Sequence, residues 1–231
     1  MLKLNIKIRY IIILFIQIWD LKTHQNVDIM KGHSSYVSSF ALNGNNTLYS
    51  GSFDCTIQVW DIKTRKVVTT VLKENTAGKH TSGHNLPVTS IYWTGDKLVS
   101  ASQDMTVKVW SKDLVCKFTL MGHTDWVLSV TVINKKIFSG SRDNTIKVWD
   151  IESGQSLATL NNHSNVVYTL ANNGKLLFSG SMDKSIKVWD TNNYQCLHSL
   201  YGHTNNVYTI IPAHGNTIFS ASWDKLIKIW Q

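Results

Sequence analysis

The sequence predicts an all-β protein assembled from repeated four-stranded units, and three observations lead to that prediction. Tryptophans recur at intervals of 41, 50, 39, 40 and 41 residues between Trp19 and Trp230. A histidine stands 26 or 27 residues before each of the last five of these tryptophans. No segment keeps the helical period of apolar residues. A period near 40 residues with these marks is typical of a β-propeller with four-stranded blades.

The composition agrees with a globular protein of a reducing compartment. The 231 residues are 43% hydrophobic and 16% charged, with a net charge of +8 and two prolines. This balance excludes a disordered chain and a proline-rich linker. Three cysteines cannot form a disulfide framework, so we expect an intracellular protein, in the cytoplasm or the nucleus.

The N-terminal residues 1–14 lie outside the repeat pattern. Lys3, Lys7 and Arg9 precede an apolar run at 10–16, as in a signal peptide, but no small-residue cleavage site follows. The run is also shorter than the roughly 20 residues of a membrane helix. We expect a truncated or misjoined start here rather than a cleaved signal, and no stable membrane insertion.

Residues 15–231 carry the repeats. Five segments align without gaps at 50–61, 100–111, 139–150, 179–190 and 220–231, and a partial copy stands at 17–20. The repeats therefore end near residues 20, 61, 111, 150, 190 and 231. Short β-branched runs broken by turn residues predict four strands in each full unit, in the fourth at 166–171, 175–180, 185–189 and 195–200. Such small sheets must stack on one another to be stable.

Every full unit also repeats four polar residues at fixed spacing. A serine lies ten residues and an aspartate six residues before each tryptophan, downstream of the histidine. Their donors and acceptors suit a buried chain from tryptophan through serine and histidine to aspartate, which we expect to tie the outer strand, the inner strand and two loops together. The five sets are His33, Ser50, Asp54, Trp60; His84, Ser100, Asp104, Trp110; His123, Ser139, Asp143, Trp149; His163, Ser179, Asp183, Trp189; and His203, Ser220, Asp224, Trp230.

Catalysis is the competing explanation for serine, histidine and aspartate occurring together. A nucleophile needs an exposed hydroxyl, an oxyanion site and a substrate pocket, and five equivalent copies favour a structural part. One histidine per unit also lacks the close ligand spacing of a metal site. We therefore expect no enzyme activity, no small-molecule substrate, no metal and no cofactor.

The recurring Gly-His, Ser-Gly/Ala-Ser-x-Asp and Ile-Lys-Val-Trp-Asp motifs resemble the WD-repeat family over residues 15–231. The resemblance implies five full repeats and a partial one, within a fragment of a six- or seven-bladed ring. A five-bladed ring is the alternative, with residues 26–30 supplying the missing outer strand of the last blade and the strand near 15–19 left surplus. The units look like propellers attached to F-box proteins, RING/TRAF-type ubiquitin ligases and myosin heavy chain kinases.

The resemblance also places three positions per repeat on one rim of the propeller. These rim positions are three and five residues after the histidine and one before the aspartate. Aromatic residues, methionine and arginine, which are enriched in protein interfaces, occupy many of them. We expect partners to bind at Tyr36, Phe53, Trp126, Leu128, Arg142, Tyr168, Met182, Tyr208 and Trp223.

The predicted function is a non-catalytic scaffold for protein or peptide partners. A substrate receptor of a ubiquitin ligase and a targeting module of a kinase stay open as finer roles. A phosphopeptide pocket is disfavoured, because Arg142 is the one arginine at the rim positions. The insertion at 73–82 is read as a solvated loop, with a partner-contacting flap as the alternative. The competing class is nucleic-acid or acidic-surface binding through the basic charge, which the dispersed lysines make less favoured.

Overall fold

The computed structural model describes residues 15–44, 46–72, 82–213 and 217–231, and in these the chain is all β. Within these ranges, twenty-one strands form six antiparallel sheets, and none of these sheets is closed. No helix within the described ranges has the length and apolar character needed to cross a bilayer. The predicted all-β class with five repeats and a partial one is confirmed, whereas the segments 1–14 and 73–81 lie outside the described residues.

The chain divides into two compact units, Met1–Val88 and Thr89–Gln231. In the first, β1 and β2 make a two-stranded sheet and β3 to β6 a four-stranded one, in chain order. Their bounds are β1 Phe15–Trp19, β2 Asn26–Lys31, β3 Val37–Asn43, β4 Thr47–Ser52, β5 Ile57–Asp61 and β6 Lys66–Val71. Since β2 pairs with β1, the alternative that gave residues 26–30 to the last blade and left 15–19 surplus is wrong.

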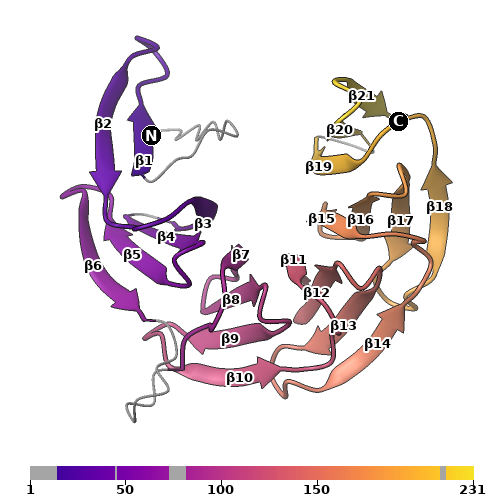
Figure 1. Cartoon of the computed structure of the whole chain (residues 1–231), viewed down its shortest axis with the longest axis horizontal. Coiled ribbons are helices and arrows are strands. Elements are labelled where there is room, and N and C mark those ends of the chain that lie inside the picture. The colour runs from indigo at the N-terminus through magenta and orange to yellow at the C-terminus, as the bar shows by residue number, and fades with distance from the viewer. Residues whose placement is uncertain (1–14, 45, 73–81, 214–216) are drawn as a thin grey trace. The chain divides into compact units, whose positions relative to one another are not determined.

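The second unit continues the series, beginning within β7. Its sheets are β7 to β10, β11 to β14, β15 to β18 and the three-stranded β19 to β21, which follow one another in chain order (Figure 1). The bounds are β7 Val88–Trp93, β8 Lys97–Ser102, β9 Val107–Ser111, β10 Cys116–Leu120, β11 Val127–Ile133, β12 Lys136–Ser141, β13 Ile146–Asp150, β14 Ser156–Leu160, β15 Val167–Asn172, β16 Leu176–Ser181, β17 Ile186–Asp190, β18 Cys196–Leu200, β19 Val207–Pro212, β20 Ile218–Ser222 and β21 Ile227–Trp230.

The apolar core lies between successive sheets. Phe138, Ile146 and Val148 on the middle strands of one sheet pack against Val167 and Leu170 on the first strand of the next. The same arrangement recurs one sheet later, with Ile186 and Val188 against Val207 and Ile210. The sheets are therefore mutually dependent, as expected of four short strands that cannot bury both faces alone.

Close approach of the next sheet explains the small residue in the middle of each second strand. A Cβ on Gly140 would lie 2.8 Å from Cγ1 of Val167, and one on Gly180 would lie 2.8 Å from Cγ1 of Val207. Glycine thus lets the first strand of the following sheet lie against the backbone. Ala101, fully buried in β8, and Ala221 in β20 are the two alanines at this position.

Candidate functional site

The four-residue polar set of the fourth repeat forms a continuous hydrogen-bonded chain, which we call the relay. The indole Nε1–H of Trp189 donates to Ser179 Oγ at 2.8 Å. Ser179 Oγ lies 2.7 Å from His163 Nε2, and His163 Nδ1 lies 2.7 Å from Asp183 Oδ2. Because an ionised carboxylate only accepts hydrogen bonds, Nδ1 of His163 must carry the proton that is donated to Asp183. Nε2 of His163 then accepts the hydrogen bond from the serine hydroxyl.

The same atoms make the same three contacts in the first, third and fifth sets, and the Trp–Ser bond recurs in the second. Tryptophan Nε1 lies 2.7, 2.8, 2.9 and 2.8 Å from serine Oγ in the first, second, third and fifth sets. The Ser-His distances of the first, third and fifth sets are 2.7, 2.8 and 2.7 Å, and the His-Asp distances are 2.8, 2.7 and 2.7 Å. The members are His33, Ser50, Asp54, Trp60; Ser100, Trp110; His123, Ser139, Asp143, Trp149; and His203, Ser220, Asp224, Trp230.

The relay joins different strands from those expected. The serine stands on the second strand of its sheet and the tryptophan on the third, as Ser139 on β12 and Trp149 on β13 show. The histidine precedes the first strand and the aspartate lies in the turn between the second and third strands. The prediction that the relay ties the outer strand to the inner strand is therefore wrong. The relay joins the two middle strands, because the indole of a tryptophan on the third strand reaches the serine on the adjacent second strand directly.

The relay carboxylates are stabilised in their ionised form. Burial alone would raise the pKa of Asp183, but hydrogen bonds from His163, Ser185 and backbone amides outweigh it and hold that pKa well below 3.8. Asp54 and Asp143 have their pKa values lowered in the same way. For Asp224, burial is again outweighed, by His203 and the amides of Leu226 and Thr204, and the pKa falls to about 2.

A hydroxyl and a left-handed turn complete the site, and the sequence analysis missed both. The side chain two residues after the aspartate donates to Oδ1, with Thr145 Oγ1 2.7 Å from Asp143 and Ser185 Oγ 2.6 Å from Asp183. The residue in between has a positive φ in every repeat, 67° to 70°. The recurring Asp-x-Thr/Ser pattern was the available signal, since such residues hydrogen-bond their own turns. In the fifth repeat Leu226 lacks the hydroxyl.

Chemically, the relay is arranged for rigidity. Ser139 and Ser179 are fully buried, and each hydroxyl oxygen already contacts an indole and an imidazole. A nucleophile in this place could not meet a substrate. Within the described ranges, no three His, Cys, Asp or Glu side chains lie together as metal ligands would.

The rim positions of adjoining loops pair with one another. In the second unit the guanidinium of Arg142 lies 4.8 Å from the ring of Trp126, and the Arg142 amide donates to the Trp126 carbonyl at 2.9 Å. In the first unit Tyr36 and Phe53 make an edge contact at 5.8 Å, bridged by the corresponding backbone bond of 2.8 Å. Each pair is between about one-third and one-half exposed.

Three rim aromatics form one stack across two neighbouring repeats. The Tyr168 and Tyr208 rings lie 4.5 Å apart at 19°, and Tyr208 and Trp223 lie 5.0 Å apart at 8°. The Tyr168 hydroxyl reaches Met182 Sδ at 3.9 Å. Leu128, expected with this group, is half-buried. We call Tyr168, Tyr208 and Trp223 the ring stack.

Comparison with known proteins identifies the repeats. The family described as WD domain, G-beta repeat matches residues 24–61, 76–111, 114–150, 154–190 and 194–231. Mitochondrial division protein 1 of Kluyveromyces lactis is 31% identical over 98 residues, F-box/WD repeat-containing protein sel-10 of Caenorhabditis elegans 34% over 99, and Putative E3 ubiquitin-protein ligase LIN-1 of Lotus japonicus 35% over 95. Each match covers 41% of this chain and 14%, 15% and 6% of those proteins. The chain belongs to the WD-repeat family.

Proposed function

We propose that this protein is a non-catalytic scaffold that binds protein or peptide partners through the loops that carry the rim positions. The observation that supports this most is the pairing of rim side chains from two separate segments of the same repeat. Trp126 with Arg142, and Tyr208 with Trp223, place large rings at or beside the turn between the second and third strands. The aspartate of that turn belongs to the relay, which holds the turn rigid. Rigid aromatic and arginine side chains are the usual centres of protein interfaces.

The nine rim residues predicted from the sequence to bind partners belong to this proposal. In the second unit it comprises the Trp126–Arg142 pair, the ring stack with Met182, and the half-buried Leu128. In the first unit it comprises the Tyr36–Phe53 pair. Ser38 and Thr89, at equivalent rim positions, instead donate to backbone carbonyls of the following repeat at 2.5 and 2.6 Å, so small hydroxyls there act in packing.

The finer role is that of a substrate receptor of a ubiquitin ligase, with a kinase-targeting module as the alternative. The names of two relatives, an F-box/WD repeat-containing protein and a putative E3 ubiquitin-protein ligase, support the first. We place the protein in the cytoplasm or nucleus, in keeping with three cysteines that are all free thiols. The buried relay serines support a protein without catalytic activity.

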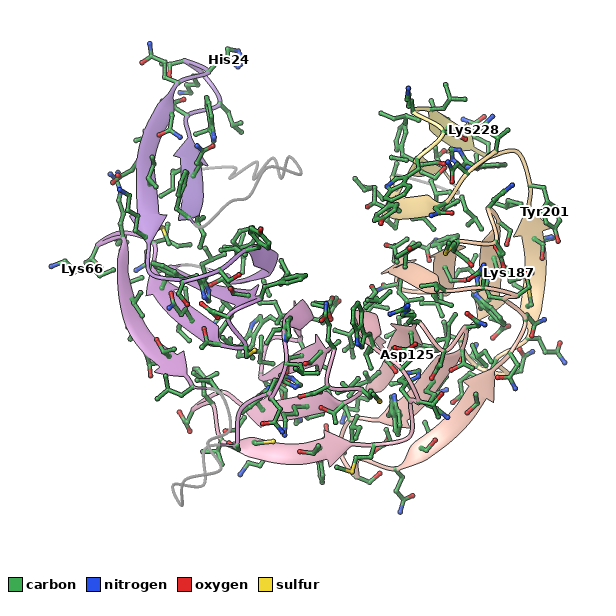
Figure 2. All side chains as sticks on the ribbon, in the orientation of Figure 1. His24, Lys66, Asp125, Lys187, Tyr201 and Lys228 are labelled. Atoms are coloured by element: carbon green, nitrogen blue, oxygen red, sulfur yellow. The ribbon has the colours of Figure 1, made fainter. Side chains whose placement is uncertain are left out.

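Binding to nucleic acid through the basic charge is less well supported. Lys108, Lys147 and Lys187 donate to hydroxyls on the neighbouring outer strand at 3.0, 3.0 and 2.9 Å. These cations therefore stabilise their own sheets; Lys187 is labelled within its sheet in Figure 2. A partner whose affinity fell steeply with rising salt would favour the charge-driven alternative.

Partner capture tests the proposal. The whole chain, immobilised, is exposed to an extract of cells of its own organism, beside the double variant Trp126→Ala/Trp223→Ala. We expect the double variant to lose most of the captured protein while its melting temperature stays near that of the wild type, because both side chains are exposed. Full retention of the captured partners by a folded double variant would show that these rim positions do not bind them.

A further inference from the structure

We propose that the ring stack, together with Lys184 and Lys225, binds an acidic peptide segment that carries an aromatic or proline side chain. The inference rests on the proposed function, because it names the chemistry of the partner at one rim surface. It is carried by two separate features, the exposed face of Trp223 and the placement of two lysines.

The ring stack offers an open face at Trp223. Tyr208 lies between Tyr168 and Trp223, and its ring is nearly parallel to the indole, at 8°. Tyr208 therefore covers one face of Trp223, while the residue is still 57% exposed. A flat ring or a proline of a partner can extend the stack on the open indole face, as aromatic-lined surfaces do for extended peptides.

Two exposed lysines stand near the stack in the chain. Lys225 stands two residues after Trp223, and Lys184 two residues after Met182, whose sulfur receives the Tyr168 hydroxyl. Both lysines occupy the left-handed turn position, with φ of 70°, and their amides donate to the carbonyls of Ser181 and Ser222 at 3.2 and 3.1 Å. The aspartates that precede them are already bonded to histidines at 2.7 Å.

Neither lysine has an ion-pair partner within the part of the chain that the structure describes. Arg142 differs, because Asp125 lies 3.7 Å from it and Trp126 lies beneath its guanidinium. Lys184 and Lys225 are thus exposed cations without an ion pair among the described residues. With a net charge of +8, the protein attracts carboxylates and repels basic peptides.

A single-stranded nucleic acid is the other ligand that combines stacking with positive charge. Such a strand stacks successive bases on separate aromatic faces. Here the rings cover one another, and Tyr208 has both faces occupied. The arrangement therefore suits one inserted planar side chain with acidic neighbours better than a row of bases.

Fluorescence anisotropy with the full chain tests the inference. The probe is a fluorescein-labelled peptide of twelve residues with Tyr-Pro at its centre and Glu elsewhere. The comparison ligands are the same peptide with Gln for Glu, the same peptide with Ala-Ala at its centre, and a twelve-nucleotide oligouridine. We expect the first peptide to bind and the other three to bind about tenfold more weakly or not at all, a difference of about 1.4 kcal/mol.

Matched variants assign the site. Trp223→Ala and the pair Lys184→Gln/Lys225→Gln are each expected to weaken the first peptide about tenfold. Two controls are expected to bind as the wild type does. Tyr201→Ala removes a 73% exposed tyrosine directly after the outer strand β18 (Figure 2), and Lys175→Gln removes an exposed lysine from the turn after β15. Equal binding by the lysine pair and the wild type, or stronger binding of oligouridine than of the peptide, overturns the inference.

Retention of the partner captured in the experiment above, compared between the Trp126/Trp223 double variant and the Lys184/Lys225 pair, distinguishes failure of this inference from failure of the proposed function. If the Trp126/Trp223 double variant loses that partner and the lysine pair retains it in full, the rim binds proteins but not through acidic segments. If both retain it in full, the proposed function itself fails. Loss in both variants, with both controls unaffected, supports the acidic segment.

Discussion

The indole N–H of Trp149 donates a 2.9 Å hydrogen bond to Oγ of Ser139, and both residues are at most 2% exposed. The bond joins the second and third strands of one sheet, and the same Oγ of Ser139 also contacts Nε2 of His123. Because both residues are buried, water cannot replace either partner of this hydrogen bond. A missing donor here leaves a buried acceptor unsatisfied, so the relay acts as a unit.

Trp149→Phe is therefore expected to lower the free energy of unfolding by about 1–3 kcal/mol. Phenylalanine keeps a buried ring but has no N–H for Ser139. Urea unfolding followed by tryptophan fluorescence measures the change. The control is Trp126→Phe, which alters an exposed tryptophan outside the relay and is expected to leave the urea midpoint unchanged; equal midpoints for all three proteins would contradict the relay's structural role.

The lowered pKa values of the relay aspartates lead us to expect that the protein loses stability in acid. Their pKa values are lower in the folded protein than the ordinary value near 3.8. A carboxyl with a lowered folded pKa stabilises the protein above its unfolded pKa, and that stability is lost as the pH falls through the folded pKa. We expect the loss to begin about one unit above the unfolded pKa, near pH 5. It should continue through about pH 2, the pKa of Asp224, and to still lower pH for Asp54, Asp143 and Asp183.

Asp183→Asn checks this assignment. The variant should be less stable than the wild type at pH 7 and should lose less further stability between pH 5 and acid, since asparagine does not titrate. Urea midpoints at half-unit pH intervals give both curves. Parallel curves for the two proteins would mean that Asp183 titrates alike in the folded and unfolded chains.

The hydroxyl next to the aspartate offers a smaller test. Thr145→Val keeps the shape but removes the 2.7 Å bond to Asp143 Oδ1, and we expect a loss of about 1 kcal/mol. Leu226→Thr is the reverse change, because it adds a hydroxyl where the fifth repeat has none. It should raise the urea midpoint, and a fall in the midpoint would show that the leucine has a packing role there.

Gln58 has a buried side-chain oxygen without a hydrogen-bond partner, and we expect a substitution there to stabilise the protein. It is 8% exposed, and its Oε1 is the one buried side-chain polar atom without a partner among the described residues. Lysines at the same place reach an outer-strand hydroxyl, and Thr70 stands opposite Gln58 as Thr159 stands opposite Lys147. Gln58→Lys should therefore raise the unfolding free energy by about 1 kcal/mol.

The mirror substitution Lys147→Gln controls for the change of side chain. It removes the 3.0 Å bond from Nζ to Thr159 and should lower the urea midpoint. If both substitutions shifted the midpoint in the same direction, the bond from a lysine to the hydroxyl opposite it would not explain the stability at this position.

Much of this arrangement was predictable from the sequence, because it repeats. The strands of the fourth unit lie within a residue of their predicted ranges, since β-branched runs and turn residues alternate there. The relay followed from the donors and acceptors of its members. The contact between Tyr168 and Tyr208 did not, because it depends on how one sheet lies against the next. The strand that carries each relay residue likewise depends on the pairing of the strands and not on spacing.

Exchange of the indole N–H protons with deuterium, followed by NMR, tests the division between buried relay and exposed rim most directly. The relay indoles of Trp60, Trp110, Trp149 and Trp189 are at most 2% exposed and bonded to serine, so they should exchange slowly. Trp126 and Trp223, which are 36% and 57% exposed, should exchange fast. Relay indoles that exchange as fast as that of Trp223 would contradict the account.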